Sequence, residues 1–223
     1  MKKIIVSLFA AVVMVLPASA AKWVAADRVP VVGKALLTKN SLPANATFKV
    51  VNGSVDNSNV ATTNVVYISS ADLAYAGNDS EVAAVVANEL GHIINGHYAK
   101  NKMKNIAKAA LTSNLSADNI ITTASNSEFM ANKSSLSDNK EADITGADMM
   151  IQAGYNPLAM VVVITKMPGS TLETLAGKPA NSERAMNVFD YLTYNYPSKV
   201  KVGYGCNEYR AFLTYANPIV ADR

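Results

Sequence analysis

The order of apolar and polar positions predicts a few strands followed mainly by helices. Alternating or clustered β-branched and aromatic residues predict strands at Thr47–Val51 and Thr63–Ser69, beside turn residues such as Asn52-Gly53. Apolar residues at helical spacing predict helices at Val31–Thr38, Ser80–Lys102, Asp138–Ala153, Pro157–Lys166 and, as the last one, Ser182–Tyr194. This order favours an α+β fold that is predominantly helical and has a small β-sheet.

Two polar features qualify this pattern. Asn78 is placed to cap the helix that starts at Ser80, with Glu81 completing a capping box. The segment from Leu111 to Asp138 is dense in Ser, Thr and Asn. It fits either a helical hairpin arm or a flap, and the pattern does not distinguish them.

The first twenty residues have the organisation of a secretory signal. Lys2 and Lys3 precede an apolar run at Ile4–Leu16, and Pro17 leads into an A-x-A cleavage site that ends at Ala20. We therefore expect residues 1–20 to be a signal peptide and residues 21–223 to form a single domain of a secreted or periplasmic protein. An uncleaved anchor helix is the alternative. After cleavage we expect no transmembrane segment.

Composition narrows the possible chemistry. Half of the residues are hydrophobic and 17% are charged, which is enough to build a packed core. Without Lys2 and Lys3, 18 basic residues face 17 acidic ones, a net charge of +1 that gives no indication of nucleic acid binding. Cys206 is the single cysteine, either buried or paired with another molecule, so a metal site must use His and carboxylates. The sequence does not indicate an oligomeric state.

The most informative stretch reads Asn88-Glu89-Leu90-Gly91-His92. At 100° per residue, Asn88, Glu89 and His92 share one side of a helix, and Glu89 falls within the apolar stripe. An unpaired buried carboxylate is costly, so Glu89 needs a partner such as a metal-bound water, a His or backbone amides. His92 fits a metal ligand or a hydrogen-bonded core histidine.

This stretch resembles the H-E-x-x-H signature of zinc peptidases, in degenerate form, with N-E-L-G-H in its place. Several motifs occur in the order of the HtpX/BepA/Oma-type zinc metallopeptidases, the gluzincins of metallopeptidase family forty-eight. These motifs are the strand Val65–Ser69, the lead-in Ser80–Ala87, His97, Glu141-Ala142-Asp143 with Gly146, Ala153–Pro157 and Ser182-Glu183-Arg184. The resemblance implies a zincin-like domain with a small sheet and an active-site helix.

The resemblance also implies a ligand set, which this chain alters. Asn88 stands at the first His position, Glu89 at the general-base position and His92 at the second His position. The third ligand position, four residues before Asp143, holds Asn139. Amides are poor zinc donors, so we expect the family's zinc to be absent or weakly bound here.

Other positions could support or replace these ligands. Glu141 is a weak alternative to Asn139, because it lies about 200° of helix away from that position. By resemblance, Asp143 is expected to orient a ligand position, here His92, or to cap local backbone. His97 is expected to make a structural hydrogen bond. Lys178 replaces the His of the family's His-Pro pair, where its cation would oppose a metal or pair with Glu89.

The resulting hypothesis is a pseudo-peptidase that keeps a groove for polypeptide. In this family an edge strand above the active-site helix binds the substrate, and here Tyr67, Ile68 and Ser69 are expected to do so. The chain would act as a chaperone or adaptor for extended or misfolded polypeptide. The first alternative is an active zinc endopeptidase of envelope quality control that uses His92 with Asn88, Glu141 or His97. The second is a structural partner protein whose groove is vestigial.

Overall fold

The computed structural model describes residues 23–100, 135–169 and 180–222, together with 173, 175, 176 and 178. The elements in chain order are α1 (Ala25–Lys39), β1 (Thr47–Val51), α2 (Val60–Thr63), β2 (Val65–Ser69), α3 (Ser70–Leu73), α4 (Asp79–Ile94), α7 (Leu136–Ala153), α8 (Leu158–Lys166), α10 (Ser182–Asn195), α11 (Pro197–Val202) and α12 (Asn207–Ala221). The predicted α+β class, predominantly helical with a small sheet, is confirmed. The predicted signal peptide and residues 111–134 of the polar segment lie outside the described residues.

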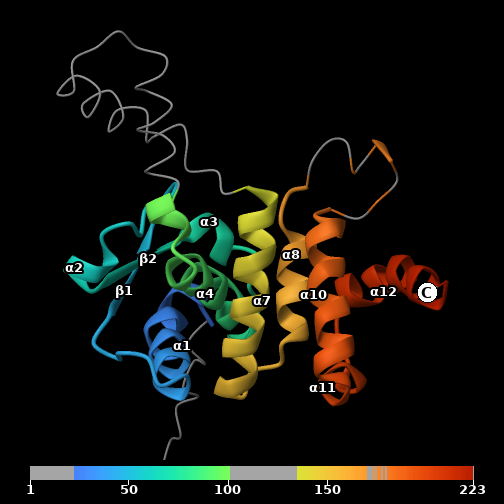
Figure 1. The fold of residues 1–223 in the computed structure, drawn as a ribbon, viewed down its shortest axis with the longest axis horizontal. Coiled ribbons are helices and arrows are strands. Elements are labelled where there is room, and N and C mark those ends of the chain that lie inside the picture. The colour runs from blue at the N-terminus through green and yellow to red at the C-terminus, as the bar shows by residue number, and fades with distance from the viewer. Residues whose placement is uncertain are drawn as a thin grey trace, which may run out of the picture.

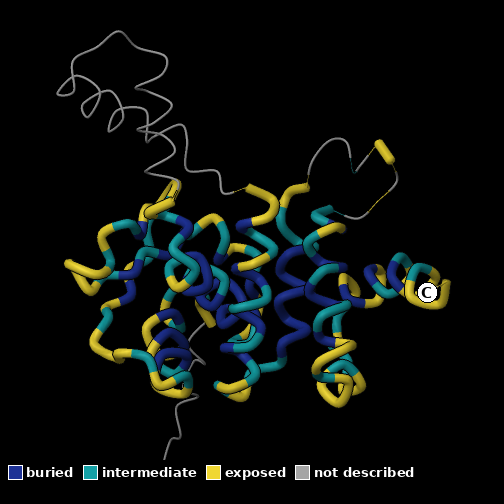
Figure 2. Tube along the Cα trace, viewed as in Figure 1, coloured by how far each residue is buried: buried dark blue, intermediate teal, exposed yellow. Residues whose placement is uncertain are grey.

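The sheet consists of β1 and β2, which pair in parallel with Thr47 opposite Val65 and Val51 opposite Ser69. It lies at one end of the molecule, and α1, α4, α7, α8 and α10 follow across the view toward α12 (Figure 1). Helix α4 packs against α1, α7 and α8, and its buried residues join those of α8 in the centre of the core (Figure 2). No described helix is long and apolar enough to cross a membrane.

Helices α4 and α7 approach each other through small residues. A Cβ atom added to Gly91 would lie 2.4 Å from the backbone oxygen of Ala142, and one added to Gly146 would lie 2.9 Å from the backbone of Ala87. This approach places Asn88, Glu89 and His92 on α4 beside the first turns of α7. The two glycines therefore set the spacing on which the site depends.

The N-terminus of α4 differs from the predicted capping box by one residue. Asn78 caps the helix as expected, since its Oδ1 accepts from the Glu81 backbone N–H at 3.1 Å. Glu81, however, accepts from the backbone N–H of Gly77 at 2.7 Å and from Lys166 Nζ at 2.8 Å. The buried Glu81 therefore joins α4 to the end of α8 instead of returning to the capping residue.

Several predicted boundaries were wrong for identifiable reasons. Helix α1 starts before Val31 and tolerates Pro30 inside it, because its apolar stripe, including Val29 and Leu36, is fully buried. The predicted helix to Lys102 stops at Ile94, since Gly96 adopts a φ of +69° before residues 97–100 turn helical again.

The starts of two other elements also differ from the prediction. The second strand begins at Val65 because Thr63 ends α2, and the third predicted helix begins at Leu136, where Ser135 and Asp138 form a capping box.

The predicted last helix is followed by two more. Helix α12 begins at Asn207 and is capped by the half-buried Cys206, whose Sγ accepts from the Tyr209 backbone N–H at 3.4 Å. Phe212 on α12 packs edge-to-face on Phe189 of α10, with ring centroids 5.3 Å apart. Helix α12 was not predicted, because its burial depends on this contact between distant segments.

Candidate functional site

An open pocket of about 350 Å³ brings α4, α7 and α10 together beside the sheet. The residues that line it are Gly53, Ser54, Val55, Ser69, Asp72, Asn88, Glu89, His92, Tyr98, Asn139, Met167 and Arg184. All four positions that the resemblance relates to zinc chemistry therefore face one cavity. A smaller cavity that shares Asn88, Glu89 and Arg184 with it continues between β2, α4 and α8.

Asn88 belongs to a buried polar network at the base of the pocket. Its Nδ2 donates to Asp143 Oδ1 at 2.7 Å, and Arg184 donates to both oxygens of Asp143, from Nε at 2.9 Å and from Nη2 at 2.8 Å. Asp143 is fully buried. Burial raises the pKa of Asp143, and the hydrogen bonds and charge of Arg184 oppose this effect. The network is thus a charge-balanced unit that links α4, α7 and α10.

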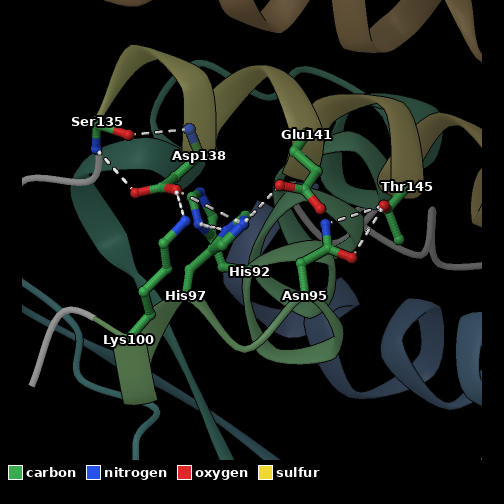
Figure 3. Close-up of polar contacts among 8 residues, drawn as sticks. All are labelled: His92, Asn95, His97, Lys100, Ser135, Asp138, Glu141 and Thr145. Atoms are coloured by element: carbon green, nitrogen blue, oxygen red, sulfur yellow. Dashed lines mark hydrogen bonds and ion pairs between the residues drawn. The ribbon is translucent and has the colours of Figure 1, made fainter. Parts of the chain in front are cut away.

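His92 is held by a chain of polar contacts along the α4–α7 boundary (Figure 3). Its Nδ1 lies 2.9 Å from Nδ1 of His97, and Nε2 of His97 lies 3.3 Å from Glu141 Oε2 and 3.9 Å from Asp138 Oδ1. When both rings are neutral, His97 donates from Nε2 to Glu141 and accepts from His92 at Nδ1. His92 then keeps an unprotonated Nε2.

The surroundings of His92 favour its neutral form. Burial, followed by the nearby His97 and Arg184, lowers the pKa of His92 to about 4, although a hydrogen bond with the Asn139 side chain acts in the opposite direction. His92, one turn after Asn88 on α4, and Asn139 on α7 therefore come together as the carried-over register requires. His92 is a neutral imidazole in this pocket at physiological pH.

Glu89 is partly buried and is fixed by two donors. Asn57 Nδ2 donates to Glu89 Oε1 at 2.7 Å, and the hydroxyl of Tyr98 donates to the same oxygen. Burial raises the pKa of the Glu89 carboxyl to about 7, while these two hydrogen bonds favour the charged form. The partner that the sequence analysis required for Glu89 is thus an amide and a phenol.

The raised pKa of Glu89 predicts a specific dependence of stability on pH. The folded chain holds the Glu89 proton more tightly than the unfolded chain does. The contribution of this proton to the free energy of unfolding is therefore full below the unfolded-chain pKa near 4.5, and it is lost as pH rises through about 7. We expect Glu89→Gln to remove up to about 3 kcal/mol of the loss between pH 5 and pH 8.5. Urea unfolding of both proteins at the two pH values measures this difference, and parallel pH profiles would contradict it.

Residues 24–192 match the profile of peptidase family M48, which covers most of the chain. The chain belongs to peptidase family M48. No curated protein and no solved structure gave a match.

Members of family M48 depend in general on zinc, so the donor set of this member is informative. The described residues contain no group of three or more His, Cys, Asp or Glu side chains placed to hold a metal ion. At the carried-over positions, His92 offers one ring nitrogen, and Asn88 and Asn139 offer amides. The guanidinium of Arg184, a permanent cation, lines the same pocket.

The supporting residues of this M48 chain lie partly elsewhere than predicted. Asp143 bonds to Asn88 and Arg184 instead of His92, because the α4–α7 spacing brings it opposite Asn88. The side chain of Glu141 is 60% exposed and contacts His97, which in turn contacts His92 at the pocket. Lys178 is exposed and lines a different pocket with Ser182 and Glu183, so the structure does not bring it to Glu89.

The predicted binding strand is also partly engaged within the chain. Tyr67 donates its N–H to Asn57 Oδ1 at 2.8 Å and accepts from Asn57 Nδ2 at 3.0 Å, so neither backbone group is free for a peptide. Ile68 is buried in the core, and Ser69 is buried at the pocket wall. The expectation that a peptide pairs along Tyr67 is therefore wrong for this arrangement.

Three residues that hold the site were missed by reasoning on the sequence. Asn57 stands in the turn-like stretch Asp56–Asn59, Tyr98 belongs to no motif, and Arg184 occurs only within the motif Ser182-Glu183-Arg184. A signal existed for Arg184, because a buried carboxylate such as Asp143 requires a cation. For Asn57 and Tyr98 the sequence gave no such signal.

We expect the buried Arg184–Asp143 pair to matter far more for the free energy of unfolding than an exposed ion pair does. Replacing Arg184 by Met leaves the fully buried Asp143 with Asn88 alone, and we expect a loss of about 3–5 kcal/mol of unfolding free energy. Lys140→Ala removes the exposed pair with Glu183 and should cost about 1 kcal/mol or less. Urea unfolding measures both, and equal losses would contradict the assigned role of the buried pair.

Proposed function

We propose that this member of family M48 is a secreted or periplasmic pseudo-peptidase that binds extended or misfolded polypeptide. The observation that carries the proposal is the network of Asn88, Asp143 and Arg184. It fills one metal-ligand position with an amide whose nitrogen faces a carboxylate, and it adds a cation to the pocket. The signal-like residues 1–20 support the location.

The side chains at the pocket do not fit a catalytic zinc. Such a zinc takes three protein ligands of the His, Cys or carboxylate type and leaves its fourth position to water. His92 is one suitable donor, whereas Asn88 directs its amide nitrogen to Asp143 and Asn139 is hydrogen-bonded to His92. No step of peptide hydrolysis follows from this arrangement, so the chemistry that remains is recognition.

The pocket wall formed by Gly53, Ser54 and Val55 is the surface we assign to the polypeptide. These residues line the open pocket together with Glu89 and His92. Within the part of the chain that the structure describes, no hydrogen bond reaches the backbone of Ser54 or Val55. An extended peptide can pair with such backbone groups without a metal, and this surface replaces the one predicted at Tyr67.

The test combines metal analysis with peptide binding. The probe is a fluorescein-labelled unfolded peptide, either a casein peptide or a fragment of reduced carboxymethylated lactalbumin. It is titrated with the purified chain, with and without EDTA. We expect micromolar affinity that EDTA leaves unchanged. Val55→Pro, which removes a backbone N–H, should weaken binding by about 10-fold, whereas the matched Val55→Ala should not.

Two outcomes would overturn the proposal. One is stoichiometric zinc together with casein cleavage that Glu89→Gln abolishes, which is the behaviour of an active endopeptidase. The other is the absence of peptide binding by the folded chain, which would leave a structural partner protein with a vestigial groove.

A further inference from the structure

The side chain of Asn57 makes three hydrogen bonds in a buried position. Its Oδ1 accepts from the Tyr67 N–H at 2.8 Å, and its Nδ2 donates to the Tyr67 carbonyl at 3.0 Å and to Glu89 Oε1 at 2.7 Å. Asn57 is 2% exposed. Both hydrogens of the amide and its oxygen are therefore used.

The two bonds to Tyr67 reproduce the pairing of a strand. Just before β2, the carbonyl of Asn64 accepts from the Thr47 N–H, so Val66 and Ile68 of β2 face β1 and Tyr67 faces the opposite edge. At that edge the Asn57 amide supplies one donor and one acceptor, as a neighbouring peptide unit would. Asn57 thus closes the edge of β2 from within the chain.

The third bond connects this edge to α4. Because Asn57 Nδ2 bridges Tyr67 and Glu89, the segment before Asn57 is fixed between β2 and α4. That segment includes Gly53, Ser54 and Val55, which form the pocket wall. Tyr98 donates to the same Glu89 oxygen and so holds the carboxylate toward Asn57.

We infer that Glu89 acts in this chain as a hydrogen-bond acceptor that anchors Asn57 and thereby positions the polypeptide-binding wall at Gly53–Val55. The inference rests on the proposed function for its last step, the binding of polypeptide at that wall. It accounts for an acidic residue at position 89 in a chain that has amides at two metal-ligand positions. We call the hydrogen bond from Asn57 Nδ2 to Glu89 Oε1 the tether. It needs an oxygen acceptor at position 89 and no metal.

The chemistry at position 57 is equally constrained. Aspartate has the same size but no donor, so it would leave the Tyr67 carbonyl unpaired and set a second carboxylate against Glu89. Alanine would leave the N–H and the carbonyl of the half-buried Tyr67 without these partners. Of the two, Asn57→Asp keeps the side-chain volume and an acceptor for the Tyr67 N–H, while it removes both donated bonds and adds a charge that repels Glu89.

The experiment separates the tether from acid–base chemistry by using two replacements of Glu89. Glu89→Gln keeps an acceptor oxygen, and Glu89→Ala removes it. Amide hydrogen exchange of Tyr67 reports the tether, and anisotropy of the labelled casein peptide reports the wall. Glu183→Ala, at an exposed acid on α10, is the control.

We expect Glu89→Ala to speed Tyr67 exchange and to weaken peptide binding, each by about 10-fold or more, and Glu89→Gln to stay within about 3-fold of wild type in both. Asn57→Asp should behave like Glu89→Ala and carries the test if the alanine variant does not fold. The inference is overturned if Glu89→Gln is as damaging as Glu89→Ala, or if Tyr67 exchange is unchanged in Glu89→Ala. Faster Tyr67 exchange in a protein whose wild type binds no peptide would support the tether and reject the proposed function.

Discussion

The double variant Asn88→His, Asn139→Glu is expected to bind zinc at least ~100-fold more tightly than the parent chain, because it supplies three strong donors with His92. The geometry favours this gain. Asn88, His92 and Asn139 line one pocket, and Asn139 already contacts His92. Asp143, which accepts from Asn88 in the parent, is placed to accept from the ring of His at position 88 and to orient it.

Competition with a zinc-sensitive dye and metal analysis after dialysis measure the change. The matched control is Asn88→Gln, Asn139→Gln, which enlarges both side chains without adding a zinc donor. Adding His92→Ala to the zinc-binding variant should abolish the gain. A folded double variant with no more zinc than its parent would show that position 139 is not the third ligand position. A parent that already retains zinc through dialysis would contradict the proposed function.

Whether the double variant also cleaves peptides depends on whether Glu89 can act as the general base. Its carboxyl has a pKa raised to about 7, but its Oε1 is engaged by Asn57 and Tyr98. If Glu89 is retained mainly as the tether, the double variant gains zinc with little casein cleavage. Strong cleavage that Glu89→Gln removes would instead show that the base function survives.

The site was predictable from the sequence where helical periodicity alone sets the arrangement. Asn88, Glu89 and His92 share one side of α4 because of their spacing, and Asn139 and Asp143 are one turn apart on α7. Carrying these positions over from family M48 therefore placed them around one pocket. The fold class followed in the same way from strands that precede helices.

The parts that could not be predicted depend on contacts between segments far apart in the chain. Asn57 reaches Glu89 only because the loop after β1 returns along β2, and nothing in its Asp-Asn-Ser neighbourhood indicates this. The prediction that Lys178 pairs with Glu89 was wrong for a related reason. Lys178 stands between the periodic segments, so no periodic pattern fixes where its side chain lies. Arg184 lies on a regular helix, yet its partner Asp143 is identified only by how α10 packs on α7.

Gly91→Ala is expected to destabilise the chain by at least ~3 kcal/mol, because the added methyl would overpack a contact between two backbones. Its Cβ would lie 2.4 Å from the Ala142 oxygen and 3.0 Å from the Ala142 Cα. Backbone atoms cannot turn aside as the end of a flexible side chain can. Helices α4 and α7 must therefore separate along their whole contact.

Separation of these helices would reach the pocket as well as the core. Asn88 and His92 lie on either side of Gly91 on α4, and both contact side chains of α7. The variant should thus lose peptide binding at temperatures where it remains folded. Gly205→Ala is the control, since a Cβ there meets nothing within 4 Å, and it should change the unfolding free energy by about 0.5 kcal/mol or less. Urea unfolding of the two variants measures the difference, and equal stabilities would mean that α4 and α7 pack less closely than this structure requires.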